Sequence, residues 1–185
     1  MAGPTGSGKS TLAEKMKESS TILSLDRYFI PPAIFDENRS IPHVLDTALI
    51  ATDVAAMLKL PIGAEYEVPV YDFKNSRRGG SEKLTIQRRL VIEGVYALRF
   101  FQNLDTPFKV YVTARLKLLR ERKVERDGKE RGRPREEVIK RFKETVIPAV
   151  RDYVRDQKPL ATYLVNTEKD TPALLERLRK SAAPV

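Results

Sequence analysis

Short apolar runs and amphipathic stretches follow one another along most of this 185-residue chain. Residues 21–25, 90–92, 108–112 and 161–165 are mostly apolar, as in strands buried on both faces of a sheet. Composition and helical periodicity predict helices over residues 10–17, 46–60, 115–126 and 135–156, and Pro172 opens a final one. This alternation predicts an α/β domain with a largely parallel sheet.

A different pattern occupies the middle of the chain. Two extended segments, residues 65–73 and 83–87, flank a polar, glycine-containing stretch at residues 75–80. They predict a β-hairpin insertion over about residues 65–88, with a basic, flexible tip. Because no Pro/Gly/Ser-rich linker divides the chain, we expect residues 1–185 to form a single domain.

A glycine-rich loop leads directly into the first predicted helix. It reads Gly3-Pro4-Thr5-Gly6-Ser7-Gly8-Lys9-Ser10-Thr11, which is the P-loop pattern. The glycines let successive backbone N–H groups face phosphate oxygens at the helix N-terminus. Lys9 would reach the β- and γ-phosphates and the Ser10 hydroxyl would ligate Mg²⁺. We therefore predict that ATP with Mg²⁺ binds here, in a P-loop NTPase-type fold, through Gly3, Thr5, Gly6, Ser7, Gly8, Lys9, Ser10 and Thr11.

The strand that normally feeds such a loop is missing from the sequence. A P-loop usually follows a buried strand in the middle of its sheet, and only Met1 and Ala2 precede Gly3. Either the sequence continues further upstream, or another segment or subunit fills the gap. The second alternative would give this chain a reason to form a homo-oligomer.

Two of the predicted strands end at a carboxylate. Asp26 follows residues 21–25, and Glu93 follows residues 90–92. Ligands of open α/β sheets bind beyond the carboxyl ends of the strands. Glu93 therefore suits the Mg²⁺ side of a phosphoryl-transfer site, and Asp26 suits a base or orienter for an acceptor hydroxyl. The alternative for each is a helix cap or a surface ion pair.

The net charge of +9 is concentrated in one segment. Residues 115–143 contain 13 Lys or Arg against 6 Asp or Glu. Arg122, Arg126, Arg131 and Arg133 lie around Gly128 and Gly132, which predicts a mobile basic lid over about residues 115–135 that closes on phosphates. A solvated pair of helices remains the alternative, with the Lys and Arg stems covering the core.

Composition excludes several other classes of site. The chain has no cysteine, so disulfides and thiolate metal sites are excluded, and its single histidine, His43, disfavours a zinc site. No apolar run approaches the roughly 20 residues of a membrane span. We therefore expect no membrane association and a reducing, cytoplasmic location.

Five blocks of the sequence resemble a known family. Residues 3–11, 24–29, 68–73, 91–98 and 130–133 resemble, in order and spacing, the uridine kinase and phosphoribulokinase family, with the uridine/cytidine kinase branch closest. The resemblance implies an ATP-dependent kinase whose general base on a nucleoside 5′-hydroxyl is Asp26, with Ser10, Asp26 and Glu93 around Mg²⁺. It further implies catalytic roles for Lys9, Arg126 and Arg131, a lid completed by Arg122 and Arg133, and acceptor contacts from Tyr28, Tyr71 and Phe73. For Tyr71 and Phe73, ordinary strand core is an equal alternative.

The sequence also departs from that family. Uridine kinases follow the Tyr-Asp-Phe block with a histidine that reads the pyrimidine, and Ser76 is nearest that place here. The family stretch whose first acid holds the ribose hydroxyls begins with Ser40, and His43 within it is expected to be structural. Without these polar contacts the site would discriminate poorly for uridine.

The acceptor is therefore left open between a nucleoside, which is favoured, and another small hydroxyl compound such as a sugar phosphate or a vitamin precursor. A nucleotide-binding protein that acts on nucleic acid is disfavoured, because the arginines alternate with acids and no aromatic stacking platform accompanies them. An inactive relative with a structural role is a third alternative.

Overall fold

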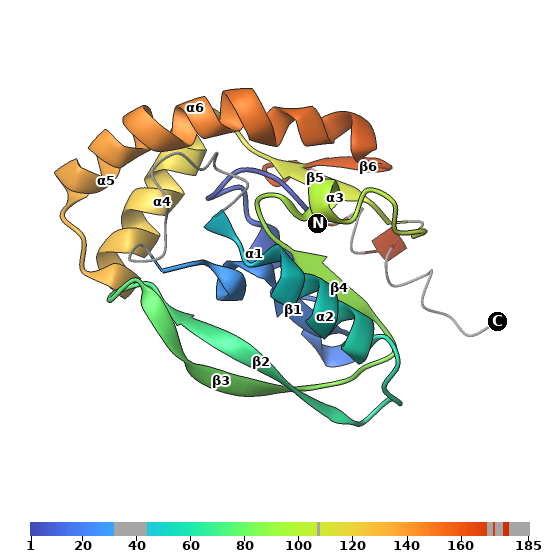
Figure 1. Ribbon diagram of the computed structural model, residues 1–185. Coiled ribbons are helices and arrows are strands. Elements are labelled where there is room, and N and C mark those ends of the chain that lie inside the picture. The colour runs from blue at the N-terminus through green and yellow to red at the C-terminus, as the bar shows by residue number, and fades with distance from the viewer. Residues whose placement is uncertain (32–43, 107, 170–171, 173–175, 178–185) are drawn as a thin grey trace.

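The four short apolar runs form two pairs of parallel strands (Figure 1). The computed structural model describes residues 1–31, 44–106, 108–169, 172, 176 and 177. In it β1 (Thr21–Ser24) pairs with β4 (Leu90–Glu93), and β5 (Val110–Thr113) pairs with β6 (Tyr163–Asn166). The predicted strands and the α/β class are thus confirmed.

Met1 and Ala2 join the two pairs. The N-terminal ammonium of Met1 donates to Ile92 O (2.6 Å), and Gly94 N–H donates to Met1 O (3.1 Å). On the other side, Ala2 N–H donates to Val110 O (2.8 Å) and Val112 N–H donates to Ala2 O (2.7 Å). These two residues therefore lie in the middle of the sheet, where the strand that feeds a P-loop is expected. A mostly apolar cavity of about 290 Å³ is lined by Met1 and by residues of β4 and β5.

Helices pack on both sides of these strands. The P-loop opens into α1 (Lys9–Glu14), followed by a 3₁₀ turn at Lys17–Ser19. The helix α2 (Thr47–Met57) begins where Asp46 Oδ1 accepts from Leu49 N–H at 3.1 Å, a side-chain N-cap. A short helix that the sequence pattern did not predict, α3 (Ala97–Phe100), follows β4. Buried side chains from β1, α2 and α3 form one continuous core.

The predicted hairpin is present, with a shorter tip than expected. β2 (Glu65–Asp72) pairs antiparallel with β3 (Arg77–Thr85), and the two form the lower layer in Figure 1. β3 begins six residues before the predicted strand, because Arg77 and Arg78 pair with Asp72 and Tyr71. Asp72 Oδ1 accepts the N–H groups of Lys74 and Asn75, which closes the turn.

The first helix of the basic segment is longer than predicted. α4 (Leu116–Arg131) runs through Asp127 and Gly128, so the predicted helix end at residue 126 is wrong. A single glycine inside a helix costs only about 1 kcal/mol relative to alanine, and tertiary contacts of α4 outweigh that cost. The helix ends at Gly132, which caps it in the left-handed conformation (φ 64°).

A second helical segment runs over residues 135–160, close to the prediction of 135–156. It consists of α5 (Arg135–Arg141), a π-helical segment (Phe142–Val146), α6 (Ile147–Ala149), a second π-helical segment (Val150–Val154) and a 3₁₀ segment (Arg155–Leu160). Pro148 lacks an N–H and cannot bond four residues back, and Ile147 N–H bonds to Phe142 O five residues back. The helix predicted from Pro172 falls largely outside the described residues.

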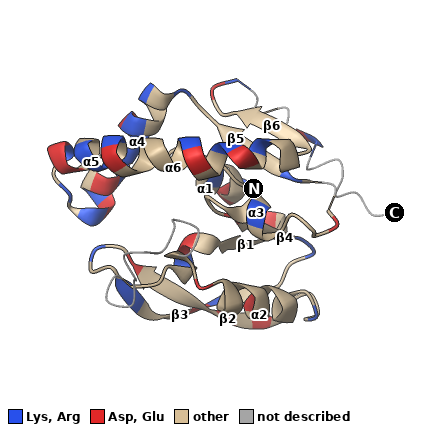
Figure 2. Cartoon of the chain, turned by 45° about the horizontal axis from the view of Figure 1, so that its top comes forward, with Lys and Arg blue, Asp and Glu red and all other residues tan. Residues whose placement is uncertain are grey.

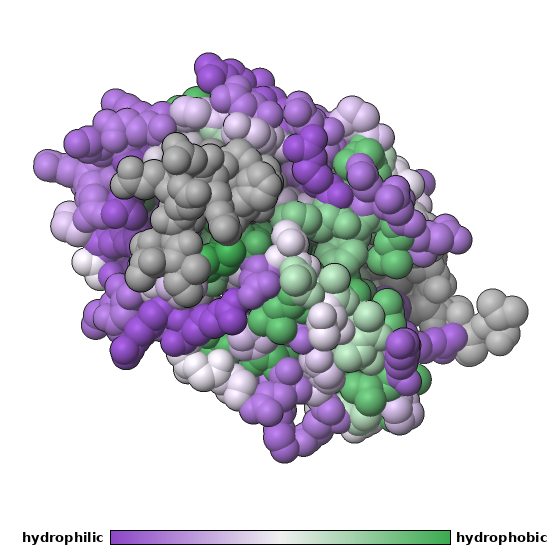
Figure 3. Space-filling model, viewed as in Figure 1, coloured by the Kyte–Doolittle hydropathy of each residue, from purple (hydrophilic) through white to green (hydrophobic). Residues whose placement is uncertain are grey.

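Basic and acidic positions are interspersed along α4 and α5 (Figure 2). Within the described residues, no helix is long and apolar enough to cross a membrane. The face shown in Figure 3 has a hydrophilic rim over α4, α5 and the hairpin, and apolar surface over α2. Leu58 and Ile62, at the end of α2, contribute to the exposed apolar area.

Candidate active site

The P-loop is held tightly between α4 and β5. Gly6 has φ 78°, and a Cβ atom placed on it would lie 2.6 Å from Leu119 O of α4. Gly8 adopts the left-handed conformation (φ 93°) and caps α1. Both positions therefore require glycine, which leaves the backbone N–H groups of the loop free to turn inward.

Lys9 lies inside the cradle that this loop forms. Its side chain is only 6% exposed, and Nζ donates to Pro4 O at 3.0 Å. Burial lowers the pKa of Lys9, although the nearby carboxylates of Glu93 and Asp26 oppose that shift. The buried Ser7 Oγ has no hydrogen-bond partner in the described part of the chain. An ammonium and a hydroxyl in such surroundings fit a phosphate group.

Ser10 and Glu93 meet at the carboxyl end of β4. Ser10 Oγ donates to Glu93 Oε1 at 3.1 Å, and Glu93 is 3% exposed. Among the described residues no three His, Cys, Asp or Glu side chains cluster as a complete metal site. The Ser10 hydroxyl and the Glu93 carboxylate still fit Mg²⁺. This ion is commonly bound by one or two carboxylates, and water and substrate phosphates complete its coordination.

Asp26 stands on the 3₁₀ turn Leu25–Tyr28 that follows β1. Burial raises the pKa of the Asp26 carboxyl, as does the charge of Glu93, while Lys9, Arg126 and Arg131 act in the opposite direction. These interactions place Asp26 in the same electrostatic cluster as Lys9 and Glu93. A carboxylate with a raised pKa is better suited to accept a proton near neutral pH.

Arg122 and Thr167 hold the outside of the loop. Arg122 Nη1 donates to Gly6 O (3.3 Å) and to Thr167 Oγ1 (3.0 Å), and Thr167 Oγ1 donates to Ser7 O (2.9 Å). In this structure Arg122 therefore binds the loop backbone. Thr167 was missed by sequence reasoning, because it lies 160 residues away from Ser7 and no motif surrounds it.

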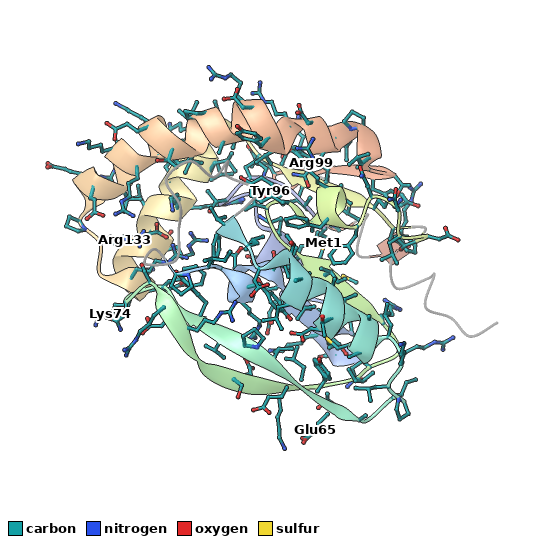
Figure 4. The ribbon with its side chains drawn as sticks, viewed as in Figure 1. Met1, Glu65, Lys74, Tyr96, Arg99 and Arg133 are labelled. Atoms are coloured by element: carbon teal, nitrogen blue, oxygen red, sulfur yellow. The ribbon has the colours of Figure 1, made fainter. Side chains whose placement is uncertain are left out.

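The other three arginines of the lid, together with Lys123, converge on one carboxylate that sequence reasoning also missed. Asp127 is 1% exposed, accepts hydrogen bonds from Lys123 and Arg126, and forms ion pairs with Arg131 at 3.3 Å and Arg133 at 3.9 Å. Arg126 Nη2 also reaches Thr5 Oγ1 of the P-loop at 3.4 Å. Arg133 at the lid end and Lys74 at the hairpin tip lie on the same side of the molecule (Figure 4).

Three aromatic rings gather between the lid and the hairpin. Tyr71 and Phe73 lie 4.9 Å apart between ring centroids, and Phe29 lies 5.6 Å and 5.8 Å from them. Arg131 covers this cluster, with its Cζ 4.2 Å from the centroid of Phe73. Phe29 was missed as a site residue, although it is the last residue of the block 24–29 that contains Asp26.

Tyr28, in contrast, points into the core. It is fully buried, and its hydroxyl donates to Asp53 Oδ2 at 2.8 Å. Tyr66 donates to the other oxygen of Asp53 at 2.9 Å. The acceptor contact predicted for Tyr28 is therefore not available to its side chain here, because the alternation of the turn directs Phe29 toward the other two rings. Ser40 and His43 lie outside the described residues, whereas Ser76 lies in the turn between β2 and β3, with φ 51°.

Most of the sequence matches a known family model. The model of the "Phosphoribulokinase / Uridine kinase family" covers residues 52–171. The chain belongs to this family.

Individual relatives vary in how much of their length is matched. The uridine kinase of Halobacterium salinarum is 30% identical over 180 residues, covering 89% of this chain and 77% of that protein. The inorganic pyrophosphatase TTM2 of Arabidopsis thaliana is 31% identical over 159 residues, covering 83% of this chain. This chain spans about a quarter of the length of TTM2 and of its counterpart TTM1, 23% and 24% respectively.

The fold is also found among solved structures. That of a possible uridine kinase from Bacillus stearothermophilus superposes with a TM-score of 0.59 at 16% identity, covering 88% of this chain and 84% of the other. At that identity the likeness concerns the fold alone, and it agrees with the P-loop kinase architecture predicted from the sequence.

Proposed function

We propose that this chain transfers the γ-phosphoryl group of ATP to the 5′-hydroxyl of a nucleoside. The observation that carries the proposal is the meeting of two sites at the carboxyl ends of β1 and β4. On one side lie the P-loop, Lys9 and the Ser10–Glu93 pair. On the other side an aromatic cluster (Phe29, Tyr71 and Phe73) offers a surface for a planar ring.

The proposed reaction is a direct displacement. The oxygen of the acceptor hydroxyl forms a bond to the γ-phosphorus, and Asp26 accepts the proton of that hydroxyl. The bond from that phosphorus to the bridging β–γ oxygen breaks, and ADP leaves with the electron pair. Lys9, Arg126 and Arg131 would stabilise the negative charge on the transferring group.

Mg²⁺ would be held by the Ser10 hydroxyl and the carboxylates of Glu93 and Asp26. When bound, it would neutralise charge on the β- and γ-phosphates. The chain itself supplies position and a fixed electrostatic environment, without a covalent intermediate.

A role on nucleic acid is less well supported by the lid. Four of its cations surround the buried Asp127, so they do not form an open basic face. A phosphate-tracking groove would need those charges directed to the surface.

The test is a coupled ADP-release assay with uridine, cytidine, other nucleosides, sugar phosphates and pantothenate-like alcohols. Turnover with nucleosides and its loss in Asp26→Asn would support the proposal. Turnover with a sugar phosphate or a vitamin precursor alone would replace the acceptor class. Binding of ATP without turnover on any acceptor would contradict kinase activity. An intact rate in Asp26→Asn would contradict the assignment of the base.

A further inference from the structure

Asp127 is the meeting point of the lid cations. Its Oδ2 accepts from Lys123 Nζ at 2.6 Å and has Arg133 Nη1 at 3.9 Å. Its Oδ1 accepts from Arg126, through Nε at 3.1 Å and Nη2 at 2.9 Å, and lies 3.3 Å from Arg131 Nη1. One buried carboxylate thus faces four cations, which without it would repel one another.

The same carboxylate is fixed by the end of the helix. The backbone carbonyl of Asp127 accepts the N–H groups of Gly132, the helix cap, and of Arg133 (3.1 Å). The loop that carries Arg131 and Arg133 is therefore attached to Asp127 through its backbone as well as its side chain. These backbone hydrogen bonds fix the positions from which the two arginine side chains extend.

Two of the guanidinium groups at Asp127 reach different halves of the proposed site. Arg126 extends to Thr5 Oγ1 of the P-loop at 3.4 Å, on the side of the nucleotide. Arg131 lies over Phe73 at 4.2 Å, on the side of the acceptor. Arg126 donates to Oδ1 and Arg131 forms an ion pair with the same oxygen, so the carboxylate sets the distance between the two guanidinium groups.

We propose that Asp127 is a positioning residue that couples the two halves of the site. It holds Arg126 at the nucleotide and Arg131 at the acceptor, at a fixed distance from each other. The inference rests on the proposed kinase function. It differs from an ordinary stabilising ion pair, because its effect is on alignment in the transition state more than on the affinity for ATP.

The test compares Asp127→Asn with the matched control Glu125→Gln, which makes the same change of charge on the exposed side of α4. In Asp127→Asn we expect kcat to fall by roughly tenfold to a hundredfold, as for a small misplacement of reacting groups. The KM for ATP should stay unchanged or fall, because the lid gains net positive charge. Glu125→Gln should behave like the wild type.

Asp127→Glu is a second variant, which keeps the test valid if Asp127→Asn fails to fold. It keeps the charge and displaces the carboxylate by one methylene. We expect it to lower kcat severalfold with little change in melting temperature. A wild-type kcat in Asp127→Glu, or equal behaviour of Asp127→Asn and Glu125→Gln, would overturn the inference. So would a raised KM for ATP at unchanged kcat, which is what a merely loosened lid predicts.

A second measurement separates this inference from the proposed function. Hydrogen–deuterium exchange of residues 122–133 is followed with and without the ATP analogue AMP-PNP, so no acceptor is needed. We expect AMP-PNP to protect these residues in the wild type and much less in Asp127→Asn, at saturating analogue. Equal protection in both proteins would overturn the inference even if no acceptor is ever phosphorylated.

Discussion

The guanidinium carbon of Arg131 lies 4.2 Å from the ring centroid of Phe73, which joins the end of the lid to the hairpin. Arg131 also forms an ion pair with Asp127 and contributes to the electrostatic environment of Asp26. A contact of this kind contributes about 0.5–2 kcal/mol, depending on how far it is shielded from water. The contact therefore links the aromatic cluster to the C-terminal end of α4.

Phe73→Leu removes the ring from this contact while keeping an apolar side chain. We expect the KM for the acceptor to rise roughly 2- to 30-fold, the range that corresponds to the loss of such a contact. The KM for ATP should stay within about twofold, because the P-loop is untouched. Steady-state kinetics with each substrate varied in turn measure both values. Tyr163→Leu, which removes an aromatic ring on the distant strand β6, is the control, and an equal effect there would refute the acceptor assignment.

Lys9→Met removes the buried ammonium from the P-loop. We expect kcat/KM to fall on the order of 10²–10³-fold, as when a single charge-stabilising donor is lost. ATP with Mg²⁺ at a hundredfold excess over Kd should raise the melting temperature of the wild type by roughly 5–10 °C, from a stabilisation of about 2.7 kcal/mol. Lys9→Met should lose this rise. Lys15→Met, exposed at the end of α1, should keep it, and nucleotide-induced stabilisation that persists in Lys9→Met would argue against the loop as the phosphate site.

Asp53→Asn disturbs the buried acceptor of two tyrosine hydroxyls. Asp53 is 5% exposed and accepts from Tyr28 and Tyr66 through separate oxygens. An amide presents one donor where an acceptor is required, so we expect a loss of about 1–3 kcal/mol in the free energy of unfolding. Differential scanning calorimetry should show a melting temperature lower by roughly 2–10 °C. The exposed substitution Asp156→Asn should leave it unchanged, and a similar shift in both variants would show that the Asp53 contacts do not stabilise the fold.

The stability of the lid should depend on pH through Asp127. Burial alone would raise the pKa of its carboxyl, but the hydrogen bond and charge of Lys123, with Arg131 and Arg126, hold that pKa below its ordinary value. A folded-state pKa below the unfolded value of about 3.9 contributes stability that is present above that value and lost as the pH falls through the folded one. Urea unfolding should therefore show Asp127→Asn less stable than the wild type at pH 7. The difference in the free energy of unfolding between the two proteins should narrow below about pH 4.

Asp105→Asn, an exposed substitution with the same change of charge, serves as the reference for that series. It should show no comparable gap at pH 7. A difference between the wild type and Asp127→Asn that stays constant from pH 7 to pH 3 would contradict the linkage to Asp127.

Local patterns predicted much of the fold. The four apolar runs became the parallel strands, and the glycine pattern of residues 3–10 became a loop that caps α1. The hairpin was predicted from its two extended segments, although its tip proved shorter. Each of these features depends on neighbours in sequence, through burial of apolar side chains or through the backbone freedom of glycine.

The errors arose where tertiary contacts outweighed local preference. Gly128 suggested a break, and the helix α4 continues through it to Arg131. Tyr28 and Phe29 are equally aromatic in the sequence, and only the position of Asp53 on α2 draws Tyr28 into the core. The aromatic cluster with Tyr71 and Phe73 therefore includes Phe29 and not Tyr28.

By itself the sequence determined the phosphate-binding loop, the two strands that end at Asp26 and Glu93, and a cluster of basic residues near the lid. It determined them because glycine spacing, apolar runs and charge act over a few residues along the chain. The tertiary structure decided that Asp127 collects the lid cations, that Thr167 supports the P-loop and that Arg131 covers Phe73. These are contacts between distant segments, and they depend on how α4, β6 and the hairpin pack around the sheet, which no local pattern encodes.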